Sequence, residues 1–293
     1  MMSARFLTVV LERAFNMRDG FGREIDYMRI SVIDSCNLNC YYCNPCDNNE
    51  HCHALNILSV KEVLCIVRAA TRLGIKHFRL TGGEPLLHPQ LDEMVLQIKK
   101  IPGVSSVSLT TNAVLLVQHA KWLKEAGIDS INVSLDTIEA SEYERITKKP
   151  LLEEVKHGIN AAIECGIRVK INVVLTPQTD VVALTRYVAK KGTDIRFIEM
   201  MPVGEGHTNG VEPYKKVIGT LSKLYGEPCR INTEKTKEIN SGNDKRKIPD
   251  NGPAEYYIFP ELGIRVGLIQ AIHGKFCDTC NRIRVTADGR LMP

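Results

Sequence analysis

The stretch that decides the fold spans residues 27–45, "YMRISVIDSCNLNCYYCNP", where a short apolar run leads into three closely spaced cysteines. Apolar and β-branched residues dominate positions 27–34, which predicts a β-strand. Cys36, Cys40 and Cys43 follow it with C-x3-C-x2-C spacing. In α/β proteins, chemistry collects where parallel strands end. We therefore expect these thiols to lie at the site-bearing edge of a sheet.

From this strand to about residue 201, the chain alternates β-like runs with amphipathic helical runs. The first helical run, residues 59–74, has Ser59 as its expected N-cap and Gly74 as its stop. Further β-like runs are 76–82, 104–112, 130–137, 167–176 and 194–201, and further helical runs are 89–100, 117–127, 139–147, 152–166 and 181–192. This alternation predicts a parallel sheet with right-handed crossovers. Six strands favour a partial barrel over a short open sheet, and spacing alone leaves both open.

The prediction is thus an α/β fold: a partial (β/α)6 TIM-like barrel over residues 1–203, with a small C-terminal α+β extension over residues 204–293. In the extension, residues 211–226 have helical spacing and residues 233–253 form a charged loop rich in Gly and Pro. Two strands are expected at 254–260 and 263–270, and a hairpin is expected around Asp288–Gly289.

Composition limits the classes of function. The 293 residues are 44% hydrophobic and 25% charged, as in ordinary soluble globular proteins. The formal charge of +4 does not argue for a nucleic-acid partner. Without a signal peptide or an apolar run near ~20 residues, we expect no membrane span and a cytoplasmic location. In a reducing compartment, clustered cysteines indicate metal binding or catalysis, whereas scattered ones such as Cys65, Cys165 and Cys229 are expected to be small buried side chains.

Zinc is one reading of the first cysteine cluster. A structural zinc ion takes four protein ligands, and the fourth could come from Cys46, His51, Cys52 or His53. Zinc therefore stays open as an alternative on local grounds.

An iron–sulfur cluster is the other reading. The ferredoxin pattern fails, because Glu50 stands where its last cysteine is expected. A four-iron cluster held by three thiolates leaves one iron open to a small molecule. Radical enzymes that use S-adenosylmethionine need such a cluster, with one iron open to bind a small molecule. Beside the third cysteine, Tyr42 either packs in the core or covers the cluster and contacts the cofactor.

Two motifs carry a family resemblance. "CNLNCYYC" (36–43) followed by "LTGGEPLL" (80–87) resembles the radical S-adenosylmethionine superfamily. Together with "SLTTN", "INVSLDT", "VKINVVL", "IRFIEMMPVG", "GPAEYY" and "FCDTCNRIRVTADGRLMP", the match resembles the GTP 3′,8-cyclase family of molybdenum cofactor biosynthesis over about Arg29–Pro293. The first motif marks only the superfamily, and the C-terminal motif is far more specific.

The resemblance implies a cofactor site. Cys36, Cys40 and Cys43 match the ligands of a first 4Fe–4S cluster. The backbone around Gly82, Gly83, Glu84 and Pro85 would meet the methionine amino group, where a side chain would block the approach. The other implied cofactor contacts are Tyr42, Ser134 and Met201.

The resemblance also implies a second 4Fe–4S cluster that holds the guanine base. Cys277 and Cys280 match two of its ligands, and zinc is the alternative for a lone C-x2-C. The third ligand would be position 294, directly after the last residue given. We therefore expect the 293-residue chain to hold one stable cluster and to turn over GTP poorly.

GTP is the implied substrate, and guanidinium groups suit its phosphate oxygens. Arg282 and Arg284, two apart in a strand, would share a face. Matching substrate positions are Arg29, Arg79, Thr110, Lys170, Arg282, Ile283 and Arg284, with Arg29, Arg282 and Arg284 implied in catalysis. Two departures stand out: Ala113 replaces a usual glycine, and His77 replaces a usual lysine.

The implied reaction is that of a lyase. A 5′-deoxyadenosyl radical takes the ribose 3′ hydrogen of GTP, and the ring closes at guanine C8. The electron would come from a donor such as flavodoxin or ferredoxin, and a homodimer is compatible with the resemblance. Two alternatives are a related radical enzyme acting on another nucleotide or a peptide, and a non-catalytic metal or electron-transfer protein.

Overall fold

The structure is a computed structural model that describes residues 17–43, 56–201, 213–231, 253–274, 278 and 280–292. Five of the candidate metal ligands considered above lie outside these ranges: Cys46, His51, Cys52, His53 and Cys277. Glu50 and most of the predicted loop 233–253 lie outside them too.

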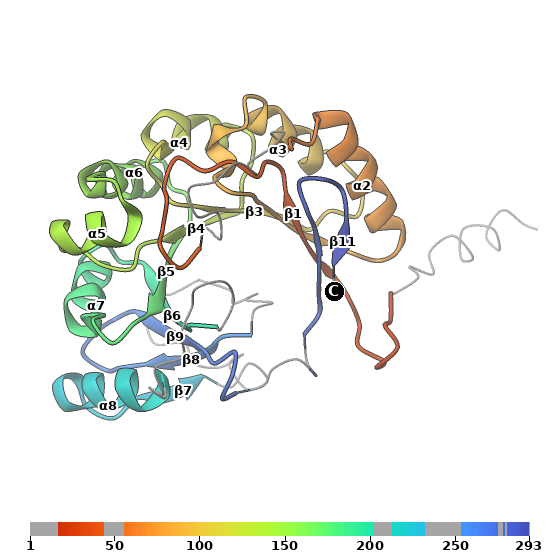
Figure 1. Ribbon diagram of the computed structural model, residues 1–293. Helices are drawn as coiled ribbons and strands as arrows, with labels where there is room; N and C mark the ends of the chain where they lie inside the picture. Colours follow the sequence, from red (N-terminus) through yellow and green to blue (C-terminus); the bar gives the residue numbers. More distant parts are fainter. Residues whose placement is uncertain are drawn as a thin grey trace, which may run out of the picture.

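Six parallel strands form the centre of the fold, each beside the next in the chain (Figure 1). They are β1 (Tyr27–Ser31), β2 (His77–Thr81), β3 (Ser106–Thr111), β4 (Ser130–Ser134), β5 (Val169–Leu175) and β6 (Asp194–Glu199). The helices between them cover the outer face of the curved sheet. The predicted partial barrel is therefore confirmed.

The helices begin and end close to the predicted positions. They are α2 (Val60–Arg72), α3 (Leu91–Lys99), α4 (Leu116–Glu125), α5 (Ala140–Thr147), α6 (Leu152–Glu164), α7 (Val181–Lys190) and α8 (Pro213–Tyr225), with a 3-10 turn η1 (Pro85–Leu87). Ser59 caps α2 as expected. Its hydroxyl accepts the Glu62 N–H at 3.3 Å, and the Glu62 carboxylate accepts the Ser59 N–H at 2.8 Å.

Strands of the C-terminal region extend the sheet at both edges. β9 (Arg265–Ile269) pairs parallel with β6, and β8 (Glu255–Ile258) and β7 (Cys229–Ile231) follow it antiparallel. At the other edge, β10 (Arg282–Val285) pairs parallel with β1, and β11 (Leu291–Met292) closes the expected hairpin. Within the described ranges, eleven strands thus form one open sheet, with β11 and β7 at its edges. Strands from both sides of residue 203 share this sheet, and the predicted boundary there stays a prediction.

The two faces of the sheet differ in polarity. Ile30, Phe78 and Leu80 are fully buried in the core between sheet and helices. Strand alternation puts Arg29 and Arg79 on the opposite, concave face. The barrel interior is therefore a polar surface that can receive a polar ligand.

One expectation about cysteines was wrong. Cys65 and Cys229 are exposed and Cys165 is only half-buried, because Cys65 lies on the outer face of α2 and Cys229 on the edge strand β7. No helix in the described part of the chain is long and apolar enough to cross a membrane.

Candidate functional site

The cysteine loop after β1 lies across the carboxyl edge of the sheet and is held from two sides. On one side, Gly83 N–H donates to Ile33 O and Glu84 N–H donates to Ser35 O, both at 2.8 Å. On the other side, the loop's Asn39 and Tyr41 N–H groups donate to carbonyls at the end of α5, at 3.0 and 3.1 Å. The loop that carries Cys36, Cys40 and Cys43 is thus fixed between β2 and α5.

The glycines of "GGEP" permit this attachment. A Cβ atom on Gly82 would lie 2.3 Å from Ile33 O, and one on Gly83 would lie 2.1 Å from Ser35 O. These neighbours are backbone atoms and cannot rotate away. From the sequence, these glycines were expected to let a cofactor approach the backbone. The structure gives a second reason for glycine, because the backbone of the cysteine loop itself leaves no room for a side chain.

Glu84 holds the end of β3. Its carboxylate is 1% exposed and accepts three hydrogen bonds, from Leu86 N–H at 3.0 Å, Thr111 Oγ1 at 2.7 Å and Asn112 N–H at 2.7 Å. Burial raises the pKa of this carboxyl. The side chain is therefore occupied inside the protein, and any ligand contact from Glu84 comes from its main chain.

Asn112 connects β3 to the cysteine loop. Its Nδ2 donates to Asn37 Oδ1 at 2.7 Å and lies 3.8 Å from Cys36 Sγ, while its Oδ1 accepts Val114 N–H at 3.1 Å. No role was assigned to Asn112 from the sequence. Its position at the end of the "TTN" strand was the signal that could have identified it.

Asp136 fixes Tyr42. The Tyr42 hydroxyl donates to Asp136 Oδ2, and Asp136 Oδ1 accepts Val174 N–H at 2.7 Å. The Tyr41 ring packs edge-on against Tyr42, with centroids 5.4 Å apart. Burial raises the pKa of Asp136 to about 6. With its hydroxyl bound to Asp136, only the ring of Tyr42 is left for contact with a ligand. Asp136 is a second residue that was not predicted from the sequence.

The three thiols suit an iron–sulfur cluster. Burial raises the pKa of Cys40 to about 12, and the neighbouring Asp136 and the other two cysteines act in the same direction. A positively charged metal centre would offset this cost of forming thiolates. Among the described residues, no three His, Cys, Asp or Glu side chains are placed to hold a single metal ion. Three thiols on one fixed loop fit a cluster in which each thiolate binds a different iron.

A row of cations crosses the concave face. Arg284, Arg29 and Arg79 are register partners on β10, β1 and β2. Burial, and then the nearby charge of Arg282, lowers the pKa of Arg29 to about 10. The Nε of Arg29 is buried without a hydrogen-bond partner among the described residues. Crowded, partly desolvated guanidinium groups of this kind favour an anionic ligand.

The C-terminal motif reaches this row through Asn281. Its Nδ2 donates to Asp26 Oδ1 at 2.5 Å, and its carbonyl accepts Tyr27 N–H at 3.2 Å. Cys280 is half-buried beside it. Arg282 and Arg284 share the concave face as predicted, whereas the Ile283 side chain lies in the core. Any ligand contact from Ile283 therefore comes from its main chain.

A second polar row continues around the barrel through Thr110, Asn132 and Lys170, with Lys170 only 4% exposed. Beside it lies Arg196 of β6, which no sequence argument singled out. Its Nε donates to Asn172 Oδ1 at 2.9 Å, and an Nη group donates to Asn132 Oδ1. A charged residue between the apolar Ile195 and Phe197 was the available signal.

The two remaining predicted cofactor contacts lie at strand ends. Ser134 is the exposed last residue of β4, and Met201, 51% exposed, follows β6. Both are therefore at the same edge of the sheet as the cysteine loop.

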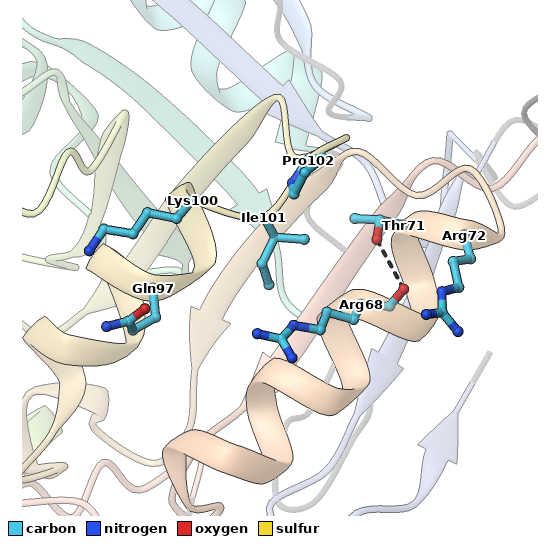
Figure 2. Close-up of a pocket in the computed structure, with 7 residues that line it drawn as sticks. All are labelled: Arg68, Thr71, Arg72, Gln97, Lys100, Ile101 and Pro102. Atoms are coloured by element: carbon cyan, nitrogen blue, oxygen red, sulfur yellow. Dashed lines mark hydrogen bonds between the residues drawn. The ribbon is translucent and has the colours of Figure 1, made fainter. Parts of the chain in front are cut away.

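A separate pocket of about 300 Å³ lies outside the barrel, between the C-terminal ends of α2 and α3 (Figure 2). Its lining includes three cations, Arg68, Arg72 and Lys100. Helices that connect parallel strands run opposite to them, so these helix ends lie at the edge of the sheet far from the cysteine loop. The pocket is not part of the candidate site.

Family models match most of the chain. Residues 30–184 match the Radical SAM superfamily, and residues 193–293 match Molybdenum Cofactor Synthesis C. Similar curated proteins include the GTP 3′,8-cyclase of Clostridium perfringens (strain SM101 / Type A), 37% identical over 276 residues, which cover 93% of this chain and 81% of that protein. The GTP 3′,8-cyclase of Pelotomaculum thermopropionicum is 38% identical over 284 residues, covering 94% of this chain and 83% of that protein.

Solved structures support the fold. Streptococcus suis SuiB bound to S-adenosylmethionine superposes with a TM-score of 0.64 at 14% identity, over 92% of this chain. The chain spans 60% of the length of SuiB. Methylornithine synthase gives a TM-score of 0.55 at 16% identity, over 78% of this chain and 71% of that structure.

Proposed function

Because this chain belongs to the radical S-adenosylmethionine superfamily and, within it, to the GTP 3′,8-cyclase family, we propose that it converts GTP to (8S)-3′,8-cyclo-7,8-dihydroguanosine 5′-triphosphate. This product serves molybdenum cofactor biosynthesis. The observation that carries the proposal is the placement of the fixed three-thiol loop and the buried arginine row on one curved sheet.

Cys36, Cys40 and Cys43 would hold the first cluster. When bound there, the cluster supplies the electron that splits S-adenosylmethionine and releases a 5′-deoxyadenosyl radical. The chain's own part is positioning. Tyr42, held by Asp136, presents its ring, while Ser134 and Met201 lie at the same edge for the cofactor's adenosine.

The concave face would hold GTP by its charge. Arg29, Arg79, Arg282 and Arg284 lie on three adjacent strands, and a triphosphate would relieve the repulsion among them. Lys170 and Thr110, on the next part of the barrel wall, and the Arg196 guanidinium complete the surface. In this proposal Arg29, Arg282 and Arg284 also act in catalysis, because the parallel pairing of β1 with β10 places them together at the ligand.

Several further features belong to the same proposal. The reaction class is that of a lyase, and Cys277 and Cys280 contribute to a second cluster that binds guanine. A small electron carrier such as flavodoxin or ferredoxin supplies the reductant, and a homodimer is compatible with this arrangement. A cytoplasmic location suits thiolate-bound clusters, which need a reducing compartment.

The test is product analysis. The full-length protein, reconstituted anaerobically with iron and sulfide, would be incubated with GTP, S-adenosylmethionine and dithionite. Cyclised GTP formed together with 5′-deoxyadenosine is the expected result. Deoxyadenosine without a cyclised nucleotide would keep the superfamily chemistry and overturn GTP as the substrate.

A further inference from the structure

Tyr27, at the start of β1, contacts two of the arginines on the concave face. The Arg79 Cζ atom lies 5.4 Å from the centroid of its ring, and the Arg282 Cζ atom lies 5.3 Å from it. Arg282 is the register partner of Tyr27 on β10, and Arg79 comes from β2 on the other side. One aromatic ring thus holds cations from both neighbouring strands.

The ring itself is held in place. Tyr27 is 6% exposed, and the His77 ring stacks beside it with centroids 6.4 Å apart and planes at 27°. His77 is fixed in turn, because its Nδ1 lies 2.8 Å from Ser106 Oγ. The Tyr27 hydroxyl, by contrast, is buried without a hydrogen-bond partner among the described residues. The Tyr27 side chain therefore contacts its neighbours through its ring.

The Tyr27 ring offsets the electrostatic cost of placing Arg79 and Arg282 close together in a partly buried site. Burial lowers the pKa of Arg282, and the charge of Arg79 acts in the same direction. The negative face of an aromatic ring attracts guanidinium groups and is strongest where water is excluded. A rigid ring between the two cations therefore keeps both charged and near each other before any anion arrives.

We propose that Tyr27 is a positioning residue for polyphosphate binding, whose ring holds the guanidinium groups of Arg79 and Arg282 ready for a phosphate chain. The inference rests on the proposed function for its natural ligand, GTP. Groups that are preorganised lose less freedom when the ligand binds, so the benefit is expected in affinity.

The experiment uses the full-length holoenzyme and three variants, Tyr27→Phe, Tyr27→Leu and Tyr27→Met. Calorimetry measures the dissociation constants of inorganic tripolyphosphate and of guanosine, and steady-state kinetics gives KM and kcat for GTP. Y27L and Y27M are expected to weaken tripolyphosphate binding about tenfold, because two arginine side chains would then become ordered only when the ligand binds. Guanosine binding should not change, and KM should rise with little change in kcat. Y27F keeps the ring and should restore tight binding.

Two aliphatic variants, Y27L and Y27M, are made so that the test does not depend on a single variant folding. Circular dichroism and thermal unfolding show which of them is folded. Tripolyphosphate binding at the wild-type level in a folded aliphatic variant would overturn the inference. So would an equal loss in Y27F, or a wild-type protein that does not bind tripolyphosphate. If the wild type binds tripolyphosphate but never cyclises GTP, the proposed function fails and the same titrations still decide the role of Tyr27.

Discussion

The buried carboxylate of Glu84 accepts the backbone N–H of Asn112 at 2.7 Å, and so fixes the residue whose side-chain amide lies against Cys36. In a Glu84→Ala variant, three donors would lose their acceptor, two of them buried and the third part-buried. Each unsatisfied group costs about 1–3 kcal/mol, so we expect the free energy of unfolding to fall by roughly 3 kcal/mol or more. E84Q keeps one carbonyl oxygen and should lie between E84A and the wild type.

Urea unfolding of the anaerobic protein measures this change in stability. The iron content after desalting shows whether the cysteine loop still holds its cluster. Glu93→Ala is a suitable control, because Glu93 is exposed on α3 and, in the part of the chain that the structure describes, its side chain accepts one hydrogen bond, from Gln90 Nε2 at 3.3 Å. E93A should shift stability by less than about 0.5 kcal/mol. Wild-type stability in E84A would contradict the assigned role of the carboxylate.

Gly83→Ala should disturb the cysteine loop itself. Its new Cβ would meet the Ser35 carbonyl, a backbone atom that can yield only if the loop moves. We expect fewer iron and sulfide ions retained per chain than in the wild type. Gly219→Ala is the matched control, because an added Cβ there meets nothing within 4 Å and the position lies in α8. G219A should be neutral or stabilising by about 0.5–1 kcal/mol, and equal cluster retention in G83A and G219A would rule out the close-approach argument.

The sequence predicted β1 to β6 well, because their alternation with helices is a local signal. The placement of β9 and β10 against the sheet edges could not be predicted. Short strands take their partners from long-range contacts, such as the bond from Asn281 to Asp26. The same contrast between local and long-range signals holds for the site. The cysteines around Cys36 form a local motif that can be recognised in the sequence. The role of Asp136 depends on its contact with Tyr42, which is 94 positions away in the chain.

Asp136→Ala should weaken binding of S-adenosylmethionine. It removes the acceptor for the Tyr42 hydroxyl and for Val174 N–H, so the Tyr42 ring is no longer held. One lost hydrogen bond of about 1 kcal/mol corresponds to roughly fivefold weaker binding. D136N keeps an acceptor and should bind nearly as well as the wild type. Anaerobic equilibrium dialysis with labelled S-adenosylmethionine measures both, and identical affinities for D136A and the wild type would show that Tyr42 needs no such support.

His77 should make polyphosphate binding dependent on pH. Burial lowers its pKa, with opposing effects from Asp26 and Asp129 and a further lowering from Lys76. The imidazole is therefore neutral near pH 7 in the free protein. A polyanion bound at the neighbouring Arg79 favours the imidazolium, so binding takes up a proton and strengthens as pH falls below about 6.5.

His77→Gln is the control, because glutamine can still bond to Ser106 but does not titrate. The ratio of wild-type to H77Q affinity for tripolyphosphate cancels the protonation of the phosphate itself. This ratio should be constant above about pH 7.5 and should rise toward pH 5.5, since the charge of His77 changes only in the lower range.

The stability of the folded protein should depend on pH in the opposite direction. The unfolded chain binds a proton at His77 more readily than the folded chain does, so the wild type loses stability relative to H77Q as pH falls below about 6.5. Thermal unfolding across this range measures that loss, and an affinity ratio that does not change with pH would mean that His77 does not face the phosphate chain.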